Sequence, residues 1–202
     1  DPAGGTTSYL YGTNKANEII NWSVNIDHEL IRVGYYAGAQ LYFTQTTDPS
    51  GKVVEEYKDK LGQVVLKRSF DGEDVYSTYY VYDDFGLLRY VISPKATKAI
   101  YDASLTTLAS DHQIVKGLCY YYQYDGRKRM VKKQLPGAEE VRMVYDVRDR
   151  LVLVQDGKTR TANQYQWLFT KYDDLNRSIQ TGLLTINNTD HTVLQTAFAN
   201  TI

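Results

Sequence analysis

A short phrase built around an aspartate recurs five times along this chain of 202 residues. The spacings between successive copies of the aspartate are 24, 42, 21 and 27 residues. Because 42 is twice 21, the repeating unit is about 20 to 25 residues long, a length typical of repeat architectures. Such a unit holds two strands and their turns, and it is too short for two parallel strands joined by a helix. The repeat therefore predicts tandem β-hairpins.

The residues of the phrase match a tight turn between antiparallel strands. A type I turn favours Asp at its first position and Gly at its fourth, and a left-handed residue after it forms a bulged hairpin connection. Two copies follow this pattern directly, whereas Lys128, Asp149 and Asn176 stand in place of the glycine in the others. We expect a positive φ at Gly62, Gly86 and Asn176, and a strained or differently shaped turn at Lys128. The candidate turn residues are Asp59, Gly62, Asp83, Gly86, Asp125, Arg129, Asp146, Arg150, Asp173, Asn176 and Arg177.

Segments rich in Val, Tyr and Thr flank these turns, as expected of strands. They are residues 75–82, 118–124, 130–135 and 141–145. Return turns between them are indicated by Asp71-Gly72, Pro136-Gly137 and Asp156-Gly157. A series of hairpin, return turn and hairpin is an antiparallel meander, so the fold class predicted for residues 40–182 is all-β.

Two stretches interrupt the strand pattern and predict short helices packed on the sheet. Residues 104–116 carry Leu105 and Leu108 at helical spacing, and residues 189–200 carry Leu194 and Phe198 on one face with Asp190 as an N-cap. We divide the chain into N-terminal strands at 1–40 leading into the repeat sheet, hairpin repeats at 41–182 with a helical insertion near 104–116, and a C-terminal helical segment at 183–202.

The composition excludes several classes of protein. With 23 basic and 24 acidic side chains the net charge is -1, which lacks the basic surplus that nucleic-acid binding requires. No apolar run approaches the length of a membrane span, and no signal peptide precedes the repeats in this segment. A single cysteine, Cys119, excludes an internal disulfide framework and a CxxC metal site.

No arrangement of residues predicts catalysis. The histidines His28, His112 and His191 share no motif, Cys119 lies beside a tyrosine run in an expected strand, and the usual nucleophile, metalloprotease and nucleotide-binding motifs are absent. We therefore expect no enzymatic activity, no cofactor and no metal. The 19 tyrosines favour packing on sheet faces, with a sugar- or protein-binding surface as the alternative. The Asp–Arg pairs of the last three copies favour a ladder of turn-stabilising ion pairs.

The phrase Tyr-Asp-x-x-Gly-Arg followed by an apolar residue resembles the YD repeats, also called RHS (rearrangement hot spot) repeats. The resemblance runs from about Tyr35 to Gly182, and residues 56–68 and 170–173 look like the Bacteroidetes branch. No copy has the whole pattern, since Gly62 and Gly86 lack the following Arg, and the arginines of the other copies follow residues other than glycine.

The resemblance implies a sheet strip that curls into a shell around a C-terminal, toxin-like cargo domain, in a bacterial protein that is secreted or displayed at the cell surface. The expected partners are the enclosed cargo and flanking repeats, of the same longer chain or another chain, that cover the sheet edges. The alternative function is a cell-surface adhesion module that binds glycan or protein. Shells of this family often carry a self-cleaving Asp-Pro-x-Gly segment. The matching strings Asp1–Gly4 and Asp48–Gly51 precede the repeats, and the second favours a type I turn.

Overall fold

The computed structural model describes residues 5–161, 164–186 and 190–199. The chain forms two compact units, Asp1–Tyr120 and Tyr121–Ile202, and each is built mainly from antiparallel strands. The all-β meander predicted from the repeats is confirmed. The division between the units falls inside a strand, and differs from the expected boundaries at residues 40 and 182.

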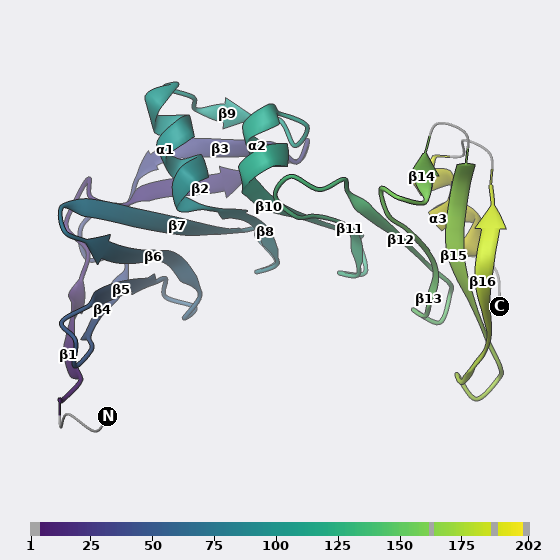
Figure 1. The fold of residues 1–202 in the computed structure, drawn as a ribbon, viewed down its shortest axis with the longest axis horizontal. Coiled ribbons are helices and arrows are strands. Elements are labelled where there is room, and N and C mark those ends of the chain that lie inside the picture. Colours follow the sequence, from purple (N-terminus) through teal and green to yellow (C-terminus); the bar gives the residue numbers. More distant parts are fainter. Residues whose placement is uncertain (1–4, 162–163, 187–189, 200–202) are drawn as a thin grey trace. The chain divides into compact units, whose positions relative to one another are not determined.

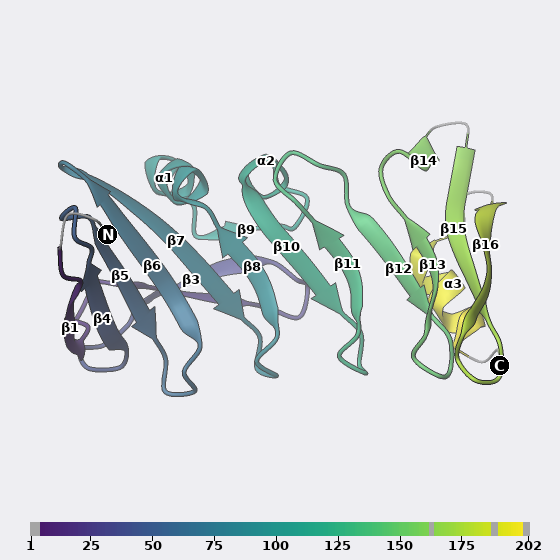
Figure 2. The same cartoon turned by 60° about the horizontal axis from the view of Figure 1, so that its bottom comes forward.

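Unit 1 contains an antiparallel sheet in which strands β4 to β8 follow one another as a meander, as Figure 2 shows. The first strand, β1, pairs with β4 at the edge. The strands are β1 (Ser8–Thr13), β4 (Tyr42–Thr47), β5 (Val53–Lys58), β6 (Val64–Asp71), β7 (Asp74–Tyr82) and β8 (Leu88–Ile92). Repeat turns and return turns alternate between β4 and β8, which is the arrangement that the sequence predicts.

The two faces of this sheet differ because successive side chains of a strand point to opposite sides. One face carries Tyr57, Leu66 and Tyr79, which stand opposite one another on β5, β6 and β7 and are at most 4% exposed. The other face carries Glu56, which forms ion pairs with Lys58 and Lys67 at 2.8 and 2.9 Å. The sheet of unit 1 therefore has one polar face and one largely buried face, which also holds the ion pair of Arg68 with Glu18 at 3.1 Å.

A second layer covers the buried face (Figure 1). It contains a three-stranded sheet of β2 (Ile20–Val24), β3 (Leu30–Tyr35) and β9 (Thr107–Leu108). Trp22 of β2 meets Tyr79 of β7 edge to face, with 6.2 Å between ring centroids. Because β2 and β3 must bury this apolar surface, they lie outside the repeat sheet. Residues 1–40 were expected to be N-terminal strands at the entry to the repeat sheet, and of the strands found there β1 belongs to that sheet.

Two helices follow β8, and neither coincides with the helix predicted at residues 104–116. Helix α1 (Pro94–Asp102) begins after Ser93, whose hydroxyl accepts a hydrogen bond from the Ala96 backbone, and helix α2 is Gln113–Leu118. Leu108, which we expected on a helical face, lies in β9 opposite Leu30 and is 1% exposed. Pairing with β3 thus overrides the helical spacing of the leucines.

Unit 2 continues the meander and carries a helix on one face. Its strands are the remainder of β10 (Cys119–Tyr124), β11 (Met130–Gln134), β12 (Val141–Tyr145), β13 (Leu151–Gln155), β14 (Arg160–Thr161), β15 (Gln164–Tyr172) and β16 (Ser178–Thr185). Helix α3 (His191–Phe198) has Asp190 as its N-cap, as predicted. Its Leu194 packs in a core with Val144, Leu153 and Trp167. The expected helical segment at 183–202 is shorter, because β16 extends to Thr185.

Candidate functional site

The five repeat turns share one backbone geometry. In each, the N–H of the aspartate donates to the carbonyl four residues later, and the N–H three residues later donates back to the aspartate carbonyl, at 2.9–3.1 Å. The residue three positions after the aspartate has a left-handed backbone, with φ of +81° at Gly62, +74° at Gly86 and +61° at Asn176. The predicted positive φ at these three positions is confirmed.

The turn at Lys128 was expected to be strained or differently shaped. Lys128 has φ of +63° and Asp149 has φ of +62°, so both turns have the same shape as the glycine turns. A side chain with a Cβ is allowed in the left-handed region at a cost of roughly 1–2 kcal/mol. The turn at Lys128 is therefore strained, as the first alternative predicted, and the hydrogen bonds of the turn offset this cost. The second alternative, a different shape, is wrong.

The aspartate side chain closes each turn. Its Oδ1 accepts hydrogen bonds at 2.8–3.0 Å from the backbone N–H groups two and four residues later. In the last three copies Oδ2 accepts from an arginine Nε at 2.6–2.8 Å, in the pairs Asp125–Arg129, Asp146–Arg150 and Asp173–Arg177. Burial opposes ionisation of Asp146, but the hydrogen bonds and charge of Arg150 outweigh it and lower the pKa of that carboxyl.

Asp48 builds the same turn at the opposite end of the strands. The Asp48 and Lys52 backbones are bonded at 2.9 Å, Gly51 has φ of +84°, and Asp48 Oδ1 accepts from the N–H groups of Ser50 and Lys52. Asp48–Gly51 is thus a turn between β4 and β5. The similar string at Asp1–Gly4 lies outside the described residues.

In three of the five copies, the residue after the left-handed position connects one turn to the next. Arg129 Nη1 donates to the carbonyl of Asp146 at 3.2 Å and to Asp149 Oδ1 at 2.8 Å. Arg150 Nη1 likewise donates to the carbonyl of Asp173 and to Asn176 Oδ1, both at 3.2 Å. In unit 1, Gln63 occupies this position and donates to the Gly86 carbonyl at 3.0 Å. The arginines are recognisable in the sequence as partners of the repeat aspartates, but their connections to the next turn are not.

The tyrosine of the Tyr-Asp pair makes a second connection. Its hydroxyl donates to the backbone carbonyl that stands five residues after the preceding repeat aspartate. The pairs are Tyr82 to Val64 at 3.2 Å, Tyr145 to Met130 at 2.9 Å, and Tyr172 to Leu151 at 3.1 Å. Burial raises the pKa of Tyr82 and Tyr145, which keeps their hydroxyls protonated as donors. The constant spacing from the previous aspartate is the sequence signal for this bond.

Cys119, His112 and His28, which share no motif in the sequence, each have a structural environment of their own in unit 1. Burial raises the pKa of Cys119 to about 12, so its thiol is protonated and unreactive. His112 caps α2 by accepting from the Ile114 N–H, and His28 contacts the buried guanidinium of Arg89. Within the residues that the structure describes, no group of three His, Cys, Asp or Glu side chains has the arrangement of a metal site. No helix in that part of the chain is long and apolar enough to cross a membrane.

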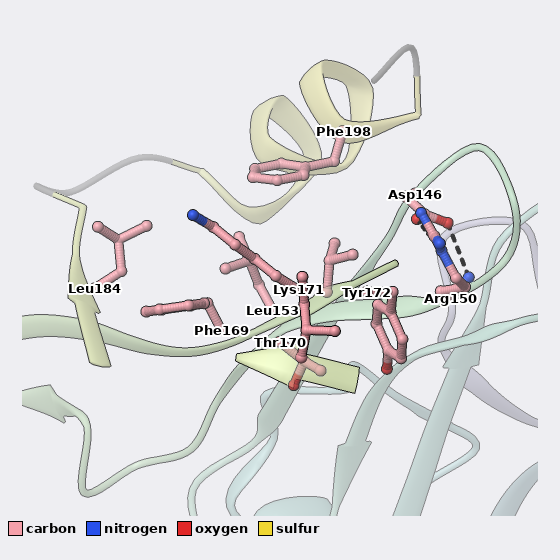
Figure 3. A pocket seen from close by; sticks show the side chains of 11 residues that line it. Asp146, Arg150, Leu153, Phe169, Thr170, Lys171, Tyr172, Leu184 and Phe198 are labelled. Carbon is pink, nitrogen blue, oxygen red and sulfur yellow. Dashed lines mark hydrogen bonds and ion pairs between the residues drawn. The ribbon is translucent and has the colours of Figure 1, made fainter. Parts of the chain in front are cut away.

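A cavity of about 550 Å³ opens between α3 and strands β13, β15 and β16 (Figure 3). Its wall is mainly apolar, with Leu153, Phe169 and Leu184 on the strands and Phe198 on the helix. At one end lies the Asp146–Arg150 pair of a repeat turn. The cavity is therefore a groove of the packing between helix and sheet, next to the ladder of turns.

Comparison with known proteins gives similarity at the level of the fold. No known family's sequence profile matches the chain, and neither does any curated protein. Among solved structures, the chain is similar to a chain of the Photorhabdus luminescens Tc holotoxin pore with a TccC3 mutation (TM-score 0.54, 15% identity, 83% of this chain covered). It is also similar to TcdB2-TccC3 (0.53, 15%, 83%) and to TcdB2-TccC3 without its hypervariable C-terminal region (0.54, 15%, 81%). The chain spans about 8% of the length of each of these chains. These matches support an RHS-type fold.

Proposed function

We propose that this chain is a non-catalytic segment of an RHS-repeat shell that encloses a C-terminal, toxin-like cargo domain of a secreted or surface-displayed polymorphic toxin, of the Bacteroidetes type. The observation that carries the proposal is the pair of side-chain connections that joins three pairs of consecutive repeat turns: those at Asp59 and Asp83, at Asp125 and Asp146, and at Asp146 and Asp173. An arginine or glutamine and a tyrosine tie successive hairpins together, as in Arg150 and Tyr172. Further repeats could be added to such a sheet through the same two kinds of side-chain bond.

The outer strands support the need for neighbouring repeats. Among the described residues, β16 pairs with β15 and with no other strand, and its Ile179 and Leu183 are 64% and 59% exposed. β1 likewise pairs only with β4 in that part of the chain, and exposes Leu10. An unpaired apolar edge strand is an aggregation hazard unless other strands cover it. Flanking repeats, in the same longer chain or another, would supply that cover.

The uncovered face of unit 2 supports contact with cargo. Met143, Val154, Leu168 and Leu183 stand opposite one another on four successive strands, on the side away from α3. Leu168 and Leu183 are 46% and 59% exposed. An apolar row of this kind on a shell's inner surface suits a cargo that exposes apolar segments.

The solved structures agree with a role in the wall and not in the cargo. The similarity to TcdB2-TccC3 persists, with 81% of this chain covered, when the hypervariable C-terminal region of that protein is absent. The matched part of that protein therefore lies outside its hypervariable region. By analogy, this chain would belong to the constant part of a toxin.

Sedimentation velocity of the isolated 202-residue chain tests the proposal. A segment with two open edges is expected to oligomerise or precipitate, and the strand-edge substitutions Ile179→Lys and Leu183→Lys are expected to reduce this association. A monodisperse, stable wild-type monomer at micromolar concentration would count against the shell. The sequence of the flanking regions is a second test, because we expect further repeats on both sides and an unrelated C-terminal domain.

An adhesion module is the second candidate, and one surface favours it. Tyr9 and Tyr11 of β1 share a face with Tyr42 of β4, and the three side chains are 60%, 72% and 62% exposed. Exposed aromatic rings on one face can stack on sugars. A glycan array tests this candidate. Binding that Tyr11→Ala abolishes and that Tyr101→Ala retains would favour adhesion, and an array without signals would remove it.

A further inference from the structure

The ladder between β11 and β12 stops halfway, and helix α3 supplies the missing bonds. The two strands pair only at Lys132 with Arg142 and at Lys133 with Val141. Continuing this register would place Val131 opposite Met143, but these residues are not paired. The β12 backbone beyond Arg142 therefore has polar groups that need other partners.

Two side chains of α3 provide those partners. The His191 Nε2 lies 2.7 Å from the carbonyl oxygen of Met143. The Gln195 amide accepts from the Tyr145 N–H at 2.9 Å and donates to the Tyr145 carbonyl at 2.8 Å. His191 and Gln195 stand four residues apart, and so lie on one face of the helix. Helix α3 therefore takes the place of a strand along Met143–Tyr145. The ribbon of α3 lies against β12 and β13 (Figures 1 and 2).

The bond to Met143 fixes which ring nitrogen of neutral His191 carries its proton. A carbonyl accepts only, so Nε2 carries the proton. Nδ1 is buried, and has no hydrogen-bonding partner among the described residues. The side chain is only 5% exposed, so a second proton on Nδ1 would place a charged N–H without an acceptor in the interior.

The charged groups around His191 oppose protonation further. Lys132 of β11 and Arg142 of β12 both act on the imidazole as like charges, and Asp190 at the start of α3 acts in the opposite sense. Glu140 lies 2.6 Å from Arg142 and 4.0 Å from Lys132, so it partly neutralises both. Burial and the two cations outweigh the Met143 bond and Asp190, and lower the pKa of His191.

We propose that α3 is a wedge between β11 and β12 that acid releases. It stays bound to the edge of β12 while His191 is neutral, and it leaves that edge when His191 is protonated. β11 and β12 then pair along their whole length in their existing register. The sign follows from linkage. Because the released state binds the proton more tightly, attachment of α3 weakens as the pH falls below the ordinary imidazole value of 6.5. The closed ladder would pair Val131 with Met143.

Hydrogen exchange of the 202-residue chain at pH 7.5 and 5.0, corrected for intrinsic rates, tests this proposal. At pH 5.0 we expect amide protection in α3 and at Tyr145 to fall severalfold, up to a ceiling of about thirtyfold, which is set by the roughly 1.5 units between the ordinary imidazole pKa of 6.5 and the pH of the experiment. Protection at Met143 is expected to rise as the strands close, and Leu153 is expected to stay protected. Loss of protection in α3 without a gain at Met143 would overturn the wedge.

His191→Gln is the informative variant, because its amide can donate to the Met143 carbonyl and does not titrate. We expect it to keep α3 protected at pH 5.0, whereas the matched control His112→Gln keeps the acid response. An acid response that persists in His191→Gln would overturn the proposal. Imidazole NMR shifts of the wild-type chain give a measurement that needs no variant: titration of His191 while α3 stays protected contradicts release.

Discussion

Arg150 and Tyr172 belong to consecutive repeat turns, and the guanidinium carbon of Arg150 lies 5.1 Å from the centre of the Tyr172 ring. The same arginine pairs with Asp146 in its own turn at 2.6 Å and donates to the Asp173 carbonyl of the next turn. Arg129 and Tyr145 repeat this arrangement one unit earlier, at 4.9 Å. Each arginine thus joins the carboxylate of one turn to the aromatic ring and backbone of the next.

Arg150→Ala is expected to destabilise unit 2 by about 2 kcal/mol. The substitution leaves the Asp146 carboxylate, whose side chain is 5% exposed, without its charged partner, and it removes the contact with Tyr172. The measurement is urea unfolding followed by circular dichroism. Arg177→Ala is the matched control, because Arg177 makes the same bond within its turn but is 72% exposed. Equal effects of the two substitutions would contradict a role in joining turns.

Gly86→Val is expected to cost about 1 to 2 kcal/mol, because φ at Gly86 is +74° and a side chain with a Cβ is disfavoured there. The added Cβ would also lie 3.1 Å from Gln63 Nε2, so the substitution would crowd the side chain that connects this turn to the preceding one. Thermal unfolding with a known unfolding enthalpy gives the difference.

Gly126→Val is the control for that substitution. Gly126 lies in a repeat turn, but a Cβ built there meets nothing within 4 Å and its φ is not left-handed. We expect a change within about 0.5 kcal/mol. A large loss at Gly126, or none at Gly86, would mean that the left-handed position does not determine the stability of the turns.

The sequence predicted the local geometry of the repeats because turn chemistry acts within four residues. Asp59 and Gly62 set their own turn whatever surrounds them, so the strands and the positive φ values could be read directly. At Lys128 the sequence indicates the strain of a left-handed backbone but not the shape of the turn, which the hydrogen bonds of Asp125 keep the same as in the other copies.

Contacts across long separations were not predictable in the same way. Leu108 lies in a strand because Leu30, 78 residues earlier, pairs with it. The bonds of Gln195 to Tyr145 join residues 50 apart, and no periodicity of the sequence indicates them. The bond from Tyr145 to Met130 is intermediate in how far the sequence indicates it. The accepting residue stands at a fixed sequence separation from Asp125, and the same separation recurs in two other repeats.

Cys119 is expected to be inert in the folded chain. Its side chain is fully buried, and burial raises the pKa of the thiol to about 12, so the reactive thiolate is absent at neutral pH. A chromogenic disulfide reagent should therefore react only as the chain unfolds in urea, with the same midpoint as circular dichroism. Rapid reaction under native conditions would show that the strand carrying Cys119 opens locally.

Tyr145→Phe is expected to destabilise unit 2 by about 1 kcal/mol. The substitution keeps the ring under the Arg129 guanidinium and removes only the hydroxyl that donates to the Met130 carbonyl at 2.9 Å. Tyr101→Phe is the control, because its side chain is 67% exposed, and we expect no measurable change in its urea midpoint. Tyr172→Phe, which removes the equivalent bond to Leu151, is expected to match Tyr145→Phe in size. If both repeat variants behaved like Tyr101→Phe, the tyrosine would contribute to the wall through ring packing, and the hydroxyl bond between repeats would carry no stability.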